Sequence, residues 1–180
     1  MNNTINTSYH KTPIGELVIG TFEGKLCLLD FRYRKMRDRV DNRLTAQLNA
    51  GFIEREDDLI HETKKQVDQY LQGIRKEFDL PLLLVGTDFQ KHVWTALCEI
   101  AYGETASYLE IATKIGNPKA VRAVAGANGA NAIALIVPCH RVIESNGGLG
   151  GYGGGVAAKK RLLAMECKAT PFTQFELALN

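Results

Sequence analysis

A cysteine and a histidine stand side by side within residues 137–141 (VPCHR). A thiolate is a nucleophile, and an imidazole can accept a proton near neutral pH. Neighbouring residues in a turning segment project to different sides, so His140 is badly placed to bond the sulfur of Cys139 directly. We therefore expect a water molecule to relay the thiol proton to His140. A carboxylate should hold the imidazole in the required tautomer, and the candidates are Glu166 and, nearer in sequence, Glu144.

The surroundings of Cys139 favour a reactive thiol. A lone cysteine is more often an inert buried residue, and a histidine beside it is often a satisfied polar group. Here, however, Pro138 ends the apolar residues 133–137, which we expect to form a buried strand or extended segment. Cys139 then lies where the chain must turn, which predicts a presented nucleophile.

Seven of the ten residues 146–155 are glycines. That composition is typical of a flexible linker. Leu149 and Tyr152, however, are spaced as packing or stacking groups, and the glycines between them allow backbone N–H groups to approach a flat ligand closely. We expect a pocket for a planar ring. The segment lacks the spacing of a phosphate-binding loop.

Residues 1–85 are expected to form a small α+β domain. Two short extended patterns, residues 15–21 and 25–31, flank a Glu-Gly turn signal and predict a hairpin. Apolar residues at helical spacing between residues 57 and 73 predict an amphipathic helix, and residues 80–85 (LPLLLV) resemble a buried strand.

Residues 86–180 are expected to form a second, mostly helical domain. A helix is predicted over residues 88–101, and a Ser-x-x-Glu capping box opens a short helix after Ser107. The Asn-Pro pair at Asn117 should start the next helix at once, and that helix should run to about residue 126. Two short helices joined by a tight turn predict a helix-turn-helix.

The second helix of this pair consists of small residues around a single arginine, Arg122. Small side chains would let the helix backbone approach a partner closely. Alanine-rich helices are also commonly packed against other helices, so packing and DNA contact both remain open from these residues alone.

Composition and charge exclude several classes of protein. The 180 residues carry a net charge of +2, so long-range attraction to nucleic acid is weak. The four cysteines lie far apart without a C-x-x-C pair, which predicts neither a disulfide framework nor a zinc site. With no apolar run of about 18 residues and no signal-peptide pattern, we expect a cytoplasmic protein without membrane contact. The basic cluster in residues 32–39 is interpreted as a solvated surface.

Several motifs occur together in one order. They are Phe89-Gln-x-x-Val-Trp94, Ser107-Tyr108, Gly116-Asn-Pro, Arg122-Ala-Val, Asn131, residues 136–143 (IVPCHRVI), the G-x-Y-x-G-G of residues 150–155, and residues 159–166. Through them the chain resembles the O6-alkylguanine-DNA alkyltransferases, also called methylated-DNA–protein-cysteine methyltransferases, over about residues 86–167. The resemblance implies an α+β fold: a small N-terminal α+β (ribonuclease-H-like) domain, residues 1–85, then a mainly helical domain with a helix-turn-helix, residues 86–180.

The resemblance also implies the chemistry. Cys139 would be the thiolate that accepts the alkyl group from O6-alkylguanine in DNA, with O4-alkylthymine as a second candidate substrate. His140 would act as base through water and Glu166 would orient it. Tyr108 would donate a proton or hydrogen bond to the leaving guanine, and Asn131 would brace the turn that carries Cys139. A thioether carbon is a poor site for a further transfer, so we expect one turnover per molecule, with no cofactor and no metal.

The partner implied is double-stranded DNA, bound by a monomer. The target atom lies inside the duplex, so the nucleotide must be turned out of the stack. In the family an arginine, here Arg122, enters the minor groove and fills the vacated place. The positions that match contacts to the DNA backbone are Gln90, Tyr108, Asn117 and Ser145. The positions that match the base-binding site are Val142, Gly150, Tyr152 and Gly153. One departure from the family is Ala132, which stands where proline is usual.

Two other classes of protein compete with this interpretation. A non-repairing helix-turn-helix DNA-binding protein would account for the two short helices and would leave the Pro-Cys-His-Arg run unexplained. A Cys-His hydrolase is disfavoured, because its base normally lies far from the cysteine in sequence.

Overall fold

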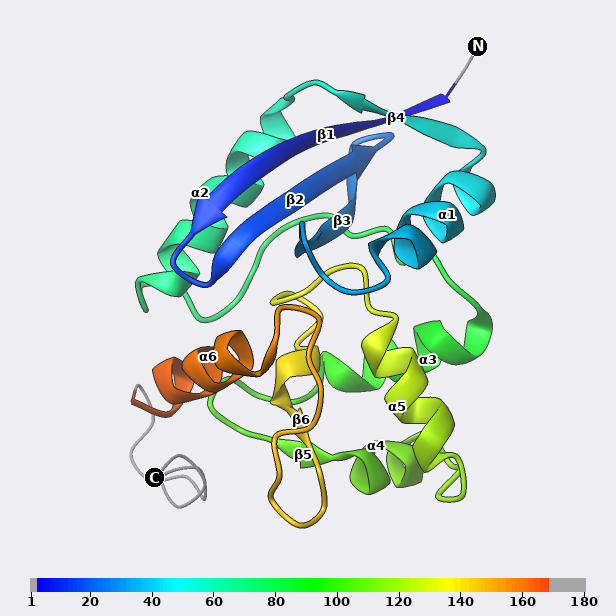
Figure 1. The fold of residues 1–180 in the computed structure, drawn as a ribbon, viewed down its shortest axis with the longest axis vertical. Coiled ribbons are helices and arrows are strands. Elements are labelled where there is room, and N and C mark those ends of the chain that lie inside the picture. Colours follow the sequence, from blue (N-terminus) through cyan, green and yellow to red (C-terminus); the bar gives the residue numbers. More distant parts are fainter. Residues whose placement is uncertain (1–2, 169–180) are drawn as a thin grey trace.

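The computed structural model describes residues 3–168. A sheet with two helices forms one part of the molecule, and a mostly helical part lies beside it (Figure 1). None of the helices in the described range has the length and apolarity that a bilayer-spanning helix requires.

The sheet has four strands in the order β3-β2-β1-β4. They are β1 (Asn3–Thr12), β2 (Gly15–Phe22), β3 (Lys25–Phe31) and β4 (Ala50–Glu54). The predicted hairpin is β2–β3, which pair antiparallel. Its turn residues Glu23 and Gly24 have φ angles of 48° and 73°, as a tight hairpin turn requires. Strand β1 was not predicted, because its polar sequence carries no strict apolar alternation.

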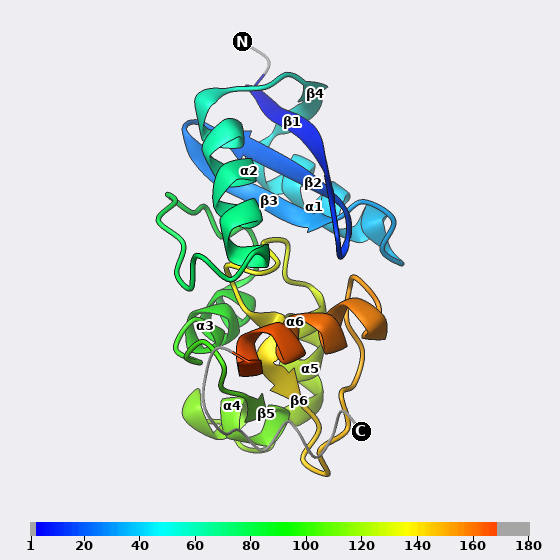
Figure 2. The same cartoon turned by 90° about the vertical axis from the view of Figure 1, so that its left-hand side faces the viewer.

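Helices α1 (Arg37–Leu48) and α2 (Asp58–Leu71) cover opposite faces of the sheet (Figure 2). The α2 helix is the predicted amphipathic helix, and the Asp57 side chain caps it by accepting the backbone N–H of Ile60 at 2.8 Å. Its buried side chains pack with Leu17 and Ile19 of β2. The side chains of α1 pack with Val18, which alternates to the other face.

The strand predicted over residues 80–85 is wrong. Only a single bridge joins Leu82 to Leu26 of β3. The Leu26 N–H donates to the carbonyl of Pro81 at 2.8 Å, and the Leu83 N–H donates to the carbonyl of Leu26 at 2.8 Å. Pro81 has no N–H, so it can accept a hydrogen bond from β3 but cannot donate one to it.

The second part contains α3 (Asp88–Leu97), α4 (Tyr108–Lys114), α5 (Val121–Gly129) and α6 (Val156–Lys168). Two short strands, β5 (Ala106–Ser107) and β6 (Val142–Ile143), pair parallel within it. The predicted capping box at Ser107 is present and opens α4. The predicted helix start at Asn117 is wrong: the Ala120 N–H donates to the Asn117 carbonyl at 3.0 Å, closing a turn, and α5 begins after Ala120.

The strand predicted over residues 133–137 is also wrong, although the segment is buried apart from the partly exposed Ile136. One bridge joins Ile133 to Leu29 of β3, and the chain then turns through Leu135, whose φ angle is 70°. The Asn131 side chain closes this turn, because its Nδ2 donates to the Val137 carbonyl at 2.8 Å and its Oδ1 accepts the Ile133 N–H at 2.9 Å. A side chain therefore replaces the sheet ladder here.

Arginines of the sheet domain bind the C-terminal end of α5. Arg34 donates to the carbonyls of Gly129 and Asn131 at 2.5 and 3.3 Å, and Arg43 donates to the carbonyl of Ala130 at 2.7 Å. These carbonyls lack partners within the helix, and its dipole favours cations at this end. The solvated interpretation of residues 32–39 is thus wrong for Arg34 and Arg37, which both pair with buried Asp30 at 2.9 Å.

We predict that Arg43→Ala lowers the free energy of unfolding by about 1–3 kcal/mol, because the half-buried Ala130 carbonyl loses its donor. Urea unfolding followed by the fluorescence of the single tryptophan, Trp94, measures the change. Arg39→Ala, at an exposed position of the same helix, is the matched control and should change stability by less than about 0.5 kcal/mol. Equal losses in both variants would contradict a role for the contact with α5.

Candidate active site

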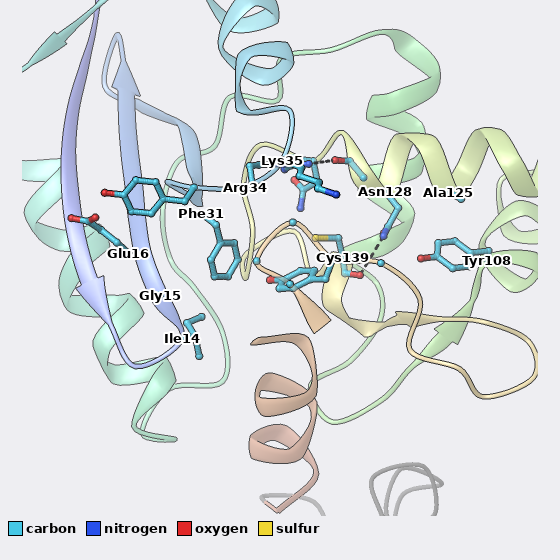
Figure 3. Close-up of a pocket in the computed structure, with 18 residues that line it drawn as sticks. Ile14, Gly15, Glu16, Phe31, Arg34, Lys35, Tyr108, Ala125, Asn128 and Cys139 are labelled. Carbon is cyan, nitrogen blue, oxygen red and sulfur yellow. Dashed lines mark hydrogen bonds between the residues drawn. The ribbon is translucent and has the colours of Figure 1, made fainter. Parts of the chain in front are cut away.

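Cys139 begins a short 3₁₀ turn, Cys139–Arg141, and lines a cavity of about 710 Å³ between the two parts of the molecule. Tyr108 lies on one side of Cys139 in this cavity and Phe31 of β3 on the other (Figure 3). The cysteine is 7% exposed, so it is reached only through the cavity. Both domains therefore build the walls around the thiol.

His140 is fully buried and bonded on one side only. Its Nε2 lies 2.9 Å from Oε1 of Glu166, which assigns the ring proton to Nε2. Its Nδ1 has no hydrogen-bond partner among residues 3–168. Burial lowers the pKa of His140 below its usual 6.5, while Glu166 opposes that shift. The imidazole is thus neutral at pH 7 and carries a lone pair on Nδ1.

The Glu166 carboxylate is held by several donors. Arg141 binds both oxygens, with Nη2 at 2.8 Å from Oε1 and Nε at 2.9 Å from Oε2. The hydroxyl of Tyr70 donates to Oε1, and the Gly103 N–H donates to Oε2 at 3.3 Å. Burial raises the pKa of Glu166, but the contacts with His140 and Arg141 outweigh it and set the pKa at about 2. Glu166 therefore stays ionised although it is buried.

The Cys139 thiol is in a different electrostatic state. Burial raises its pKa above the usual value, and the hydrogen bond with Asn131 and the charges of Lys159 and Arg34 oppose that effect. A thiol with a raised pKa needs a nearby group that takes its proton before it can act as a nucleophile. The arrangement of a buried thiol beside a neutral imidazole suits nucleophilic chemistry.

The glycine segment is fixed in place by Lys159. This fully buried side chain on α6 donates from Nζ to the carbonyls of Val142 at 2.6 Å and Gly151 at 3.5 Å, and also to the Leu149 carbonyl. Burial lowers the pKa of Lys159 to about 8. A Cβ at Gly154 would lie 2.4 Å from the ring of Phe31. The segment is thus a packed wall of the cavity, so the linker alternative is wrong.

Comparisons with known proteins agree with this geometry. Residues 5–84 match the family model described as "6-O-methylguanine DNA methyltransferase, ribonuclease-like domain", and residues 88–168 match the model of that family's DNA binding domain. The chain belongs to the 6-O-methylguanine DNA methyltransferase family. The predicted resemblance and the predicted fold class are confirmed. The division at residues 85 and 86 remains a prediction.

Individual relatives cover most of the chain. The methylated-DNA–protein-cysteine methyltransferase of Methanosarcina barkeri is 46% identical over 87% of this chain and 93% of its own length. The constitutive enzyme of Bacillus subtilis is 43% identical over 85% and 89%. The crystal structure of Mycobacterium tuberculosis OGT in complex with DNA is 40% identical, with a TM-score of 0.77 over 98% of both chains.

The structure brings most of the predicted catalytic and base-binding residues to one place. Cys139, Tyr108, Asn131, Tyr152 and Gly153 line the cavity. The two remaining base-binding candidates, Val142 and Gly150, are not among the residues that line it. Val142 is fully buried with its carbonyl on Lys159, and a Cβ at Gly150 would lie 3.3 Å from the Tyr108 hydroxyl. The roles assigned to these residues remain predictions of the family resemblance.

Among the predicted DNA-contacting residues, Tyr108 lines the cavity with Cys139, whereas Arg122, Asn117, Ser145 and Gln90 do not. Arg122 on α5, Asn117 in the turn before it, and Ser145 after β6 are exposed. Gln90 is half-buried and already bonded, because its Oε1 accepts the Thr87 N–H at 3.0 Å in the capping box of α3. Gln90 can therefore reach a phosphate only with the amide nitrogen of its side chain.

Sequence reasoning missed several residues of this site. Tyr70 was counted only as part of an apolar helix face, and nothing in the sequence relates it to Glu166, 96 positions away. Asn128, whose Nδ2 lies 3.4 Å from the Cys139 carbonyl, carried no signal. Arg141 stands inside the VPCHR run, so a buried partner for it could have been sought. No group of three or more His, Cys, Asp or Glu residues in the described chain could hold a metal ion.

We predict that Glu166→Gln lowers the free energy of unfolding by about 3–5 kcal/mol at pH 7, because Arg141 stays buried without its counter-charge. The folded-state pKa of Glu166, about 2, lies below the usual value of 4.5. Its ionisation therefore stabilises the fold above pH 4.5, and that stabilisation is lost as the pH falls toward 2.

Urea unfolding of the wild type and the variant between pH 7 and pH 3 measures both the loss of stability at pH 7 and the dependence of stability on pH. The variant should show a smaller loss of stability below pH 4.5 than the wild type. Glu104→Gln removes an exposed carboxylate and serves as the control, with a change below about 0.5 kcal/mol. A Glu166→Gln variant with wild-type pH dependence would disprove the assignment.

Proposed function

We propose that this protein repairs DNA as a methylated-DNA–protein-cysteine methyltransferase, moving the alkyl group from O6 of guanine to its own Cys139. It acts once per molecule, as a cytoplasmic monomer on double-stranded DNA. The observation that carries the proposal is the set of contacts at Cys139. The thiol lies in a cavity, next to a neutral His140 whose Nε2 is held by Glu166 at 2.9 Å.

The reaction is a direct displacement. The thiol proton of Cys139 passes through a water molecule to Nδ1 of His140, the nitrogen without a partner among the described residues. The sulfur then forms a bond to the alkyl carbon, the bond from that carbon to O6 breaks, and its electron pair stays on the guanine. Tyr108 gives its proton to the guanine and recovers one from His140, so the net transfer moves the thiol proton to the base.

Tyr108 is suited to that donor role. Its hydroxyl lies in the cavity, and burial raises its pKa above the usual 10. The phenol therefore keeps its proton at neutral pH until the guanine takes it. A charged donor would instead need desolvation inside the cavity.

One turnover per molecule follows from the thiols of the chain. Among the described residues that line the cavity, Cys139 is the single cysteine. Cys27 and Cys167 are buried elsewhere, and Cys98 is exposed at the end of α3. The thioether formed at Cys139 thus has no neighbouring thiol that could take over the alkyl group, and the modified protein is the end product.

Helix α5 presents a surface that suits close approach to DNA. Its exposed residues are small except for Arg122, and they include Ala123, Ala125 and Gly126. A helix without long side chains can enter the minor groove, and Arg122 then occupies the place of the nucleotide turned out of the stack. The side chains of Asn117, Ser145 and Gln90 bind the sugar-phosphate backbone of the DNA. A net charge of +2 agrees with few phosphate contacts.

The alternative of a non-repairing helix-turn-helix protein is not favoured. Such a protein needs the surface of α5 and has no use for a cavity that ends at a buried thiol. It would also have no use for a carboxylate, an arginine and an imidazole buried together behind that thiol, where each charge has a desolvation cost.

We predict that a duplex with one O6-methylguanine increases the intact mass of the protein by one methyl group, located on Cys139 by peptide mapping. The Cys139→Ser variant should stay unmodified, because a serine hydroxyl is a far weaker nucleophile. Cys98→Ser, at the exposed cysteine, is the matched control and should react like the wild type. Repair of many duplexes per protein molecule would contradict single turnover.

We predict that Arg122→Ala slows repair in duplex DNA at least tenfold and leaves the reaction with free O6-methylguanine base within about twofold. The free base needs no extrusion from a stack, whereas a duplex costs a few kcal/mol to open. Lys119→Ala, an exposed cation near the same helix, provides the comparison for a general loss of charge. Equal losses on duplex and free base would show that Arg122 does not support extrusion.

A further inference from the structure

The sheet domain contributes one side chain to the buried charges behind Cys139. Tyr70 lies near the C-terminal end of α2 and is fully buried. Its hydroxyl donates a hydrogen bond to Oε1 of Glu166 and lies 3.3 Å from Nε2 of His140. The contact thus links the two domains at the group that orients the base.

The two oxygens of Glu166 are not equivalent. Oε1 accepts from His140 Nε2 at 2.9 Å, from Arg141 Nη2 at 2.8 Å and from the Tyr70 hydroxyl. Oε2 accepts from Arg141 Nε at 2.9 Å and from the Gly103 N–H at 3.3 Å. Tyr70 therefore donates to the same carboxylate oxygen as His140, whereas Arg141 donates to both oxygens.

A carboxylate beside an imidazole stabilises the protonated ring. An imidazolium cannot accept the thiol proton, so a carboxylate that acted on His140 alone would lower the fraction of the ring that is neutral at pH 7. A hydrogen bond from a hydroxyl to the same oxygen withdraws part of its negative charge. The geometry therefore makes Tyr70 a competitor of His140 for Oε1.

We propose that Tyr70 is a positioning residue for alkyl transfer, which keeps His140 neutral and its Nδ1 available to Cys139 by donating a hydrogen bond to Glu166. This inference rests on the proposed function. The sequence gives no such signal, because Tyr70 occupies an ordinary apolar position of an amphipathic helix. The structure thereby makes the sheet domain a part of the chemistry as well as a support for it.

Other titratable groups face the same pair and set the background for Tyr70. Of the two cations that lower the pKa of His140, Arg141 has the larger effect, and its guanidinium carbon lies 5.7 Å from the centroid of the Tyr102 ring. The groups that face the pair also include Tyr102 after α3, Lys159 on α6 and Tyr152 in the glycine segment, and Cys139 stands beside His140 in the same turn. Tyr70→Phe removes only the hydroxyl, with its contacts to Glu166, His140 and Arg141, and leaves the side chains of these other groups in place.

The test is the pH dependence of Tyr70→Phe. Phenylalanine keeps the ring contacts with Phe78 and Tyr102, whose centroids lie 5.1 and 6.1 Å away. The acid limb of the rate of alkyl transfer should move to higher pH by about half a unit or more. The midpoint of His140 in an NMR titration of its ring protons should move in the same direction, with the resonance assigned from its loss in His140→Gln.

Tyr102→Phe is the matched control. This tyrosine contacts Tyr70 edge to face, and its hydroxyl has no hydrogen-bond partner among residues 3–168. Its removal should leave both midpoints in place. Equal shifts in the two variants, or a Tyr70→Phe variant that only melts at a lower temperature, would overturn the proposal.

The two readouts separate this inference from the proposed function. The NMR titration needs no alkylated DNA, so an unmoved His140 midpoint overturns the role of Tyr70 whatever the substrate is. A moved midpoint in a protein that never gains an alkyl group on Cys139 overturns the proposed function instead.

Discussion

The ionised carboxylate of Glu166 is the constraint on which the rest of the structure depends. Moving a carboxylate out of water costs several kcal/mol, which must be offset by donors in good geometry. Here the donors come from α2, from the loop after α3 and from the 3₁₀ turn, at separations of 96, 63, 26 and 25 residues from Glu166. The carboxylate can be buried only when all these segments are docked. The same contacts fix the ring of His140, so assembly of the domains and preparation of the base are one event.

A second set of contacts holds the thiol itself. The segment from Asn131 to Cys139 has little secondary structure, yet its backbone is bonded on both sides. The Leu29 N–H donates to the Ala132 carbonyl at 2.8 Å, and the Ala134 N–H donates to the Leu29 carbonyl at 2.6 Å. Asn131 closes the turn from within. Ala132 lacks the fixed φ angle of the proline usual in the family, and the bridge to β3 supplies that restriction instead.

Local signals in the sequence predicted the elements that depend on neighbouring residues. The Glu-Gly turn of the β2–β3 hairpin and the capping box at Ser107 are examples, because their geometry is set within a few residues. Residues 80–85 were predicted as a strand, and residues 133–137 as a strand or extended segment, because a short buried apolar run and a strand have the same sequence pattern. Each makes only a single bridge to β3, and the turn through Leu135 could not be read from its residue type.

The partners of charged residues were harder still to predict from the sequence, because several of them lie far away along the chain. Arg34 looked like part of a solvated cluster, because a sequence does not reveal that Asp30 is buried or that α5 ends nearby with unpaired carbonyls. The residues alone left Glu166 and Glu144 as alternative partners for His140, and the family resemblance favoured Glu166. Tyr70 was beyond reach, because its hydroxyl matters through one contact across the domain boundary.

Because the thiol reacts only once, its site can be held by buried contacts between distant segments. An enzyme that turns over must release its product and often moves loops to do so. Here only the repaired base departs, and the alkyl group stays on the sulfur. The acceptor end of the cavity can therefore be fixed by buried, long-range contacts that would slow a cycling enzyme. Such a site permits a glycine wall held to Lys159 through the carbonyls of Leu149 and Gly151, and a hydrogen-bonded turn before Cys139. Under the proposed function, a fixed thiol leaves the conformational cost to the DNA, because the nucleotide would have to leave the stack and enter a cavity that is already formed.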